Sequence, residues 1–312
     1  MSFTGSSIST RRARAPRAFA AALVALLFGS SAAHAQTALR TGLFVSDDAD
    51  DTSVVKLSAG ALFRYAGPAS YRGLVVEQLR IRPVGDDRWD DQRVFYAFAG
   101  GEAWRWSGQV GTDGDTVIGG VNTVREGTVR QEYFVERDIL ETREGIRGRY
   151  HTFAGAAFDV PLGDGERQQA TVLVGAQEFD GRNLRSHLRA RYVAVLNPEW
   201  GLSAQLRSRA FHNSVPFESD YYSPRWFVEA MPTVQLRRFH RRWMVAGAIG
   251  WGQQRDSESD RRDARLVEAS VTSPAAADRS FLRASASYSN TPTGAGASYG
   301  YRQLMVEWIK PF

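Results

Sequence analysis

Apolar and polar residues alternate along most of the chain after residue 35, and the pattern is longest over residues 182–211. Successive side chains of a β-strand point to opposite faces, so a period of two predicts strands. The alternation stops at residues 197–199, where a proline marks a turn, and then resumes. This stretch therefore predicts a hairpin of two long strands.

The two faces of this hairpin differ in chemistry. One face carries Leu184, Leu188, Leu202 and Leu206 with small residues between them, and the other carries a series of arginines. Each strand is roughly twice the 5 or 6 residues that are usual in soluble sheets. Such a length suits a strand that is tilted across a bilayer. We therefore interpret the leucines as lipid-facing and the arginines as lumen-facing.

Similar alternating segments follow one another through residues 36–312, which we predict to form one all-β domain, an antiparallel transmembrane β-barrel. We count about sixteen strands, with about 12 to 18 as alternatives, and bacterial single-chain barrels have even numbers. The three longest connections, residues 212–224, 253–262 and 290–296, all fall at one end of such a barrel. We expect that end to be extracellular.

Residues 1–35 have the features of a cleaved secretory signal peptide. Arginines at positions 11, 12, 14 and 17 precede an apolar run over residues 18–29, and residues 33–35 read Ala-His-Ala. No later apolar run is long enough for a spanning helix. Export together with a β-barrel predicts the outer membrane of a Gram-negative bacterium. The expected partners are therefore outer-membrane lipid and lipopolysaccharide.

Composition removes several other classes of function. The formal charge of +5 includes the four leader arginines, so the remaining chain is close to neutral and nucleic-acid binding has no support. Ser186 and His187 are neighbours in one strand and would face opposite ways, so they cannot form a nucleophile and base pair. The acidic residues 47–51 lack the glycine and distal glutamate of an EF-hand loop. We therefore expect no catalytic residues, no metal site and no cofactor.

The polar faces of the strands supply the candidate solute path. A cationic wall would attract anions or hydrogen-bond a hydroxyl-rich solute, and few acidic residues share the predicted lumen face. Alternatively, the arginines pair with lumen acids and only hold the wall in shape. The same parity places Arg72, Gln78, Arg80 and Arg82 toward the lumen. The candidate residues are Arg147 and Arg149 in a strand over residues 146–160, and Arg185, His187, Arg189, Arg191, Arg207 and Arg209 in the hairpin.

Aromatic residues gather at the end of the longest predicted loop. Tyr221, Tyr222 and Trp226 lie close together there. Aromatic faces stack on sugar rings, so these residues are candidates for contact with a glycan. Tyr and Trp are also enriched at membrane boundaries, and an interfacial girdle is the alternative interpretation.

Three segments carry a resemblance to a known family. Residues 133–142 (YFVERDILET), 198–204 (PEWGLSA) and 220–225 (DYYSPR) are similar to the C-terminal outer-membrane barrels of exopolysaccharide-export proteins. These include the poly-N-acetylglucosamine export porin and the outer-membrane component of cellulose synthase. The resemblance implies a sixteen-stranded barrel that exports a polysaccharide. In those relatives tetratricopeptide repeats precede the barrel, and no such repeat pattern follows residue 36 here.

From these observations we predict an outer-membrane channel, rather than an enzyme, that exports an exopolysaccharide through an arginine-lined lumen. An anion-preferring porin for small solutes and a plugged structural or surface barrel are the alternatives. Without the repeats, a separate periplasmic polysaccharide-export partner would connect the channel to synthesis. The final residue, Phe312, ends an alternating strand and resembles the signal that the barrel-insertion machinery reads.

Overall fold

A computed structural model describes residues 36–48, 52–85, 88–163, 167–275, 280–290 and 300–312. The predicted signal peptide, residues 1–35, lies outside the described residues. The strands are β1 (Gln36–Asp48), β2 (Ser53–Tyr65), β3 (Tyr71–Arg82), β4 (Trp89–Gly100), β5 (Arg105–Thr112), β6 (Val117–Arg125), β7 (Arg130–Ile139), β8 (Tyr150–Leu162), β9 (Gln168–Phe179), β10 (Leu184–Asn197), β11 (Leu202–Asn213), β12 (Trp226–His240), β13 (Trp243–Asp256), β14 (Arg262–Thr272), β15 (Phe281–Ser289) and β16 (Tyr301–Pro311).

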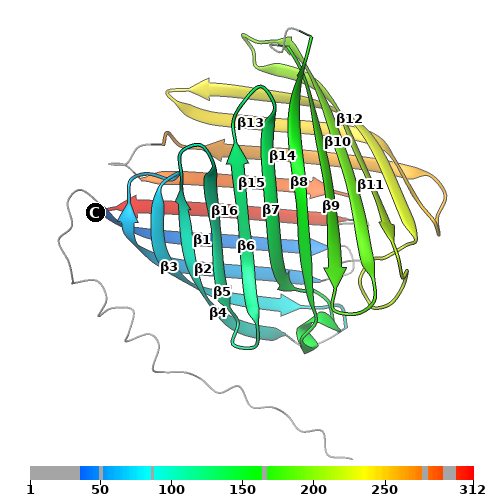
Figure 1. The fold of residues 1–312 in the computed structure, drawn as a ribbon. Coiled ribbons are helices and arrows are strands. Elements are labelled where there is room, and N and C mark those ends of the chain that lie inside the picture. Colours follow the sequence, from blue (N-terminus) through cyan, green and yellow to red (C-terminus); the bar gives the residue numbers. More distant parts are fainter. Residues whose placement is uncertain (1–35, 49–51, 86–87, 164–166, 276–279, 291–299) are drawn as a thin grey trace, which may run out of the picture. The chain divides into compact units, whose positions relative to one another are not determined.

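These sixteen strands form one closed antiparallel barrel in which each strand pairs with its neighbours in sequence (Figure 1). The barrel closes where β1 pairs with β16, from Ala38 opposite Pro311 to Asp48 opposite Tyr301. Closure removes every free strand edge, which is what allows a sheet to cross a bilayer. Both the predicted strand number and the predicted fold class are confirmed.

An even number of strands places the beginning of β1 and the end of β16 at the same end of the barrel. The connections at this end include the four-residue turn 198–201 and the two-residue turn 241–242. The opposite end carries longer connections, among them residues 140–149 and 214–225. The predicted long loop at 253–262 is shorter than expected because β13 continues to Asp256. Most of the predicted loop at 290–296 lies outside the described residues.

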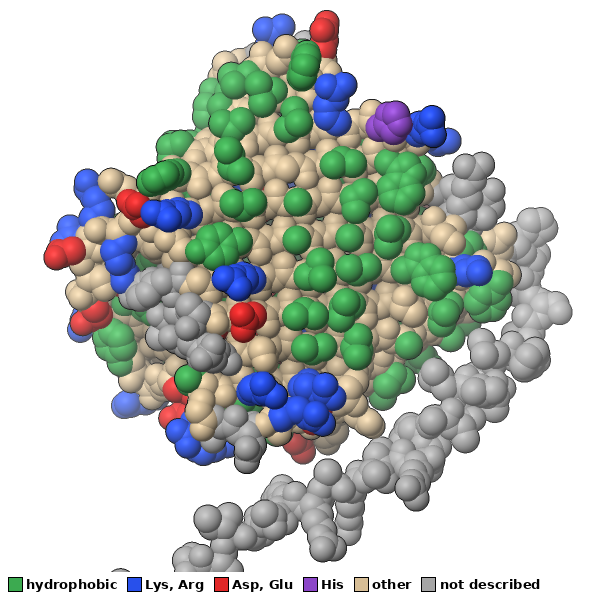
Figure 2. Space-filling model, turned by 180° about the vertical axis from the view of Figure 1, so that it is seen from behind, with side chains coloured by type: hydrophobic (Ala, Val, Ile, Leu, Met, Phe, Trp, Pro, Cys, Tyr) green, Lys and Arg blue, Asp and Glu red, His purple; other side chains and the backbone are tan. Residues whose placement is uncertain are grey.

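The outer surface of the barrel is apolar over a broad band (Figure 2). Leu188 and Leu206 are 50% and 45% exposed on this surface, whereas Arg185 and His187, their neighbours in the alternation, are buried inside. This confirms the predicted parity of the hairpin. A closed barrel with an apolar exterior and a charged interior is an outer-membrane barrel. No helix among the described residues is long and apolar enough to cross a membrane.

The prediction for β3 was wrong. Arg72, Gln78, Arg80 and Arg82 face outward, because the other face of β3 packs inside the barrel. Its inward residues join a hydrophobic cluster that fills part of the interior beside β1, β2 and β4, and this cluster includes Val54, Leu62, Tyr71, Val75, Leu79, Ile81 and Phe95.

Candidate functional site in the barrel lumen

The basic wall of the lumen lies on β10 and β11. Their pairing register sets Arg189 directly opposite Arg209, and Arg191 directly opposite Arg207. Like charges placed opposite each other on one face of a sheet destabilise it unless other groups compensate. The turn at residues 198–201 fixes this register and with it the two arginine pairs.

Two of these four arginines have acidic partners. Arg207 Nη1 lies 2.9 Å from Glu268 Oε2, and Arg209 Nη2 lies 3.5 Å from Glu229 Oε2. Arg189 has no ion pair within the described part of the chain. Arg191 makes only a long hydrogen bond to the Thr171 hydroxyl, at 3.4 Å.

Two acids meet these four arginines, so they pair with half of the wall and do not neutralise it. Glu229 stands on β12 directly opposite Arg209, whereas Glu268 stands on β14 and reaches Arg207 from three strands away. The residual positive charge is concentrated on β10.

Arg185 also lies on β10, and aromatic rings hold its side chain in place. Its guanidinium carbon lies 4.9 Å from the centre of the Phe179 ring and 4.6 Å from that of Phe211. Its Nε donates to Asn213 Oδ1 at 2.9 Å, and one Nη donates to the carbonyl of Tyr222. Cation–π contacts are strongest when the cation is desolvated, and Arg185 is only 1% exposed. Arg185 is thus a structural element of the wall.

His187 follows Arg185 on the lumen face, and its Nε2 lies 3.1 Å from Gln177 Oε1. Gln177 Nε2 in turn lies 3.2 Å from His151 Nδ1. Ser186 points outward, as predicted from the alternation. No group of three or more His, Asp or Glu side chains in the described ranges is placed to hold a metal ion.

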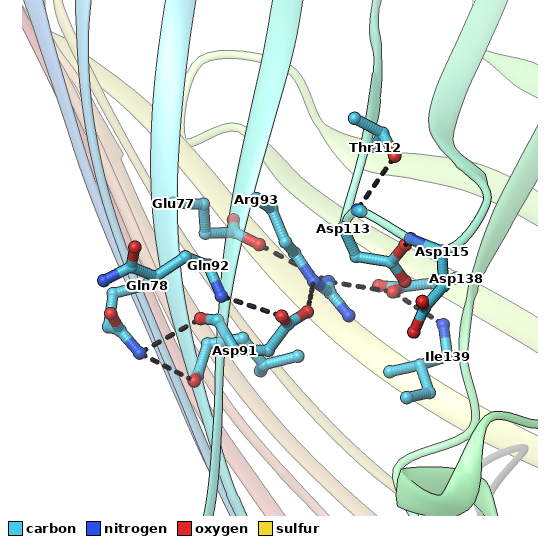
Figure 3. Close-up of polar contacts among 12 residues, drawn as sticks. Glu77, Gln78, Asp91, Gln92, Arg93, Thr112, Asp113, Asp115, Asp138 and Ile139 are labelled. Carbon is cyan, nitrogen blue, oxygen red and sulfur yellow. Dashed lines mark hydrogen bonds and ion pairs between the residues drawn. The ribbon is translucent and has the colours of Figure 1, made fainter. Parts of the chain in front are cut away.

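The opposite wall is organised around Arg93 of β4. Arg93 is 1% exposed and meets three carboxylates, Glu77 at 3.5 Å, Asp91 at 3.1 Å and Asp138 at 2.9 Å (Figure 3). Lys56 of β2 adds to this cluster, since its Nζ lies 3.0 Å from Asp138. Because β4 and β7 are not neighbours, the contact of Arg93 with Asp138 crosses the lumen.

Sequence reasoning missed Arg93. The available signal was its place between Asp91 and Phe95 on the inward face of β4, but its other two partners, Glu77 and Asp138, come from β3 and β7.

Two cavities lie inside the barrel, with volumes of about 720 and 420 Å³. Lys56, Glu136 and Asp138 line both, so this group marks the boundary between them. The larger cavity extends toward Arg40 and Glu307, and the smaller toward the arginines of β10 and β11. The cluster around Asp138 therefore lies between two parts of the lumen, one on the side of Arg40 and the other on the side of the β10 and β11 arginines.

A third part of the wall is uncharged over most of its area. Small residues face inward on β13 and β15, and they line a further cavity of about 230 Å³ together with Glu268 and Gln303. Short side chains leave space beside the wall, and hydroxyl groups can bond to a passing solute. The small inward residues are Ala246, Ala248, Ser285 and Ser287.

Two of the predicted lumen arginines are not on a strand. Arg147 ends a short 3-10 helix, Gly145–Arg147, and Arg149 follows it in the connection between β7 and β8. Arg149 pairs with Glu144 of the same connection at 3.4 Å. The prediction failed because β8 begins at Tyr150, four residues later than expected. Both arginines lie beyond the strand ends, on the side of the longer connections.

The predicted glycan-contact residues have other roles. The Tyr221 ring stacks on Phe179 at 4.1 Å and is 4% exposed, so it has no free face for a sugar. The Tyr222 hydroxyl donates to Asp256 at 2.6 Å, and its ring packs edge-on against Phe211. Trp226 faces outward instead, beneath Arg255. The structure therefore corrects the glycan prediction for Tyr221, whereas Tyr222 is half-buried and a sugar contact there stays a prediction.

The connection that carries Tyr221 and Tyr222 folds against the barrel end. Its Glu218 carboxylate accepts the backbone N–H groups of Arg182 and Asn183 at 2.7 and 2.8 Å. Burial raises the pKa of Glu218, but these N–H groups outweigh it and hold the pKa below its ordinary value. Asn183 also donates to the Tyr221 hydroxyl, at 2.9 Å. The connection is thereby fixed over β9 to β11.

No protein-family model matches this chain, and no curated protein matches it in sequence. A solved structure described as a bacterial polysaccharide outer membrane secretin is 12% identical with a TM-score of 0.64, over 90% of this chain and all of its own. Acinetobacter baumannii OccAB3 is 11% identical with a TM-score of 0.41, over 89% of this chain and 99% of its own. The first similarity confirms, at the level of the fold, the resemblance seen in the sequence.

Proposed function

We propose that this barrel is a channel that exports a hydrophilic polysaccharide across the outer membrane. The observation that carries the proposal is the division of the lumen wall into a basic ladder on β10 and β11 and a small, hydroxyl-bearing surface on β13 and β15. Such a wall offers hydrogen bonds along its length and little apolar surface to retain a sugar chain. The solved structure with the higher TM-score carries a polysaccharide in its description.

The proposal assigns no catalysis to the chain. The polymer would be pushed across the outer membrane by its own synthesis on the periplasmic side of the channel. We therefore also propose a periplasmic export partner. Phe312 would be read during insertion, since its ring is 71% exposed at the barrel end where its N–H bonds to Thr37.

A small-solute porin with anion preference is the second candidate. It is favoured by Arg189 and Arg191, which project into the lumen without an ion pair within the described ranges. A porin of this kind would conduct chloride in preference to potassium. It would show no residence of a sugar polymer.

Single-channel recording of the refolded barrel tests the proposal. Linear sugar oligomers of about ten units, one neutral and one bearing carboxylates, would be added to one side of a planar bilayer. Export predicts discrete blocking events whose duration grows with chain length. Ion conduction without such events would support the porin, and a barrel that conducts nothing would contradict both candidates.

A further inference from the structure

The turn between β12 and β13 has an unusual sequence for its backbone. His240 pairs with Trp243, so the loop has two residues, Arg241 and Arg242, with φ angles of 48° and 70°. Positive φ at both positions identifies a type I′ turn, for which Asn-Gly is strongly preferred. Side chains with a Cβ are strained in this conformation. The turn thus holds two arginines where the backbone favours neither.

These arginines belong to a larger group, here called the arginine turn. All of its members are exposed, and none forms an ion pair with a described residue. Glu199, the acid in the adjoining β10–β11 turn, pairs with none of them. The group consists of Arg238, His240, Arg241 and Arg242.

The arginine turn adjoins the lipid-facing surface. Trp200 and Trp243 are 60% and 38% exposed beside it, and the Arg238 guanidinium lies 5.6 Å from the centre of the Trp200 ring. The exposed side chains of Leu236 and Val245 continue this surface toward the middle of the barrel. Exposed tryptophans beside an apolar band mark the level of the lipid headgroups. Figure 2 shows basic side chains and a histidine above the apolar band, near the upper right edge.

We propose that the arginine turn binds the phosphates of anionic phospholipids at the rim of the barrel. Guanidinium groups bind phosphate with paired hydrogen bonds, and each basic residue near an anionic bilayer adds to the attraction. An acidic protein would meet the same charges, but continuity with the tryptophans and the apolar band favours lipid. The site lies outside the lumen, so it does not depend on the proposed export function.

Native mass spectrometry of the refolded barrel in detergent tests this site, with phosphatidylglycerol and the net-neutral phosphatidylcholine as probes. The informative variant is Arg241→Asn with Arg242→Gly, because it removes two charges and supplies the preferred turn sequence, so the barrel stays folded. The parent should bind phosphatidylglycerol more tightly than phosphatidylcholine. The variant should bind phosphatidylglycerol about 10- to 30-fold more weakly than the parent does.

Arg255→Gln with Arg261→Gln is the matched control, since it removes two exposed charges at the opposite end of the barrel. Arg255 also lies over a tryptophan, Trp226, at 5.8 Å. The control should keep its affinity for phosphatidylglycerol. Equal affinity of the parent for both lipids, or an equal loss in variant and control, would overturn the proposal. Unchanged lipid binding in the turn variant would also overturn the proposal, and an acidic protein would then be the alternative partner of these arginines.

Discussion

The wall around Arg93 and the wall of β10 and β11 use the same kind of residue in opposite ways. Arg93 is buried among Glu77, Asp91 and Asp138, which together exceed its charge. On β10 and β11 arginine faces arginine, and part of the charge has no acidic partner among the residues that the structure describes. The first wall therefore has its arginine within a network of fixed ion pairs, whereas the second keeps two arginines, Arg189 and Arg191, without an ion pair to a described residue.

The different burial of the arginines explains why one wall contains ion pairs and the other contains arginines that face each other. A charge in the dry interior must be paired, because desolvation costs several kcal/mol per ion. Arg189 is exposed to the lumen, where water and counter-ions screen it. The exposed Arg189 can therefore lack an ion pair to a described residue, whereas the buried Arg93 is surrounded by three carboxylates. The two regions show that an arginine's role follows from its burial and partners.

The largest expected effect comes from removing the charge at Arg93. Arg93→Met leaves three part-buried carboxylates without their shared partner and should lower the free energy of unfolding by about 3–5 kcal/mol, measured by urea unfolding in a bilayer or detergent. Arg80→Met is the control, since Arg80 pairs with Asp90 on the exposed outer face of the same region. It should cost about 0.5 kcal/mol or less. Similar losses in both variants would remove the distinction between the walls.

The next prediction tests which side of β10 faces the lumen. Leu188→Arg places a charge in lipid and should destabilise the barrel by about 2–4 kcal/mol. Ser285→Arg places the same charge in the lumen, beside the cavity at β13 and β15, and should be mild. Folding yield and unfolding in lipid vesicles compare the two. Equal damage would show that the assigned parity is wrong.

Arg185 and Arg189 separate structural from functional charge on one strand. Arg185→Gln removes contacts with two aromatic rings and should cost about 2 kcal/mol, whereas Arg189→Gln should change stability by about 0.5 kcal/mol or less. The reversal potential in a salt gradient should show the opposite order, with Arg189→Gln moving it further toward cation preference. If both variants keep the parent's reversal potential, the basic wall is structural.

The smallest effect concerns the connection over β9 to β11. The pKa of Glu218 is lowered in the folded state, so its contribution is present above the ordinary carboxyl range and is lost as pH falls through the lowered value. Amide exchange at Arg182 and Asn183 should then accelerate roughly 3- to 5-fold beyond its normal pH trend. Glu218→Gln should exchange faster at neutral pH and lose this response. A variant that keeps the parent's pH profile would exclude Glu218.

The sequence by itself determined the strands and the barrel type. A period of two over residues 184–197 and 202–213 fixes which side chains share a face, because the β pleat alternates at every residue. The leucines of β10 and β11 identify the lipid side. Local alternation is sufficient for this, since it depends on neighbours along the chain.

Only the tertiary structure decided which charges remain free. Arg93 meets Asp138 across the lumen, and Arg207 meets Glu268 three strands away. Both pairings exist only once the barrel has closed. Closure also decided the orientation of β3, whose two faces both carry apolar residues, because Leu79 and its neighbours fill the interior. Alternation assigns residues to faces, but contacts across a lumen depend on strand register and closure, which no local pattern encodes.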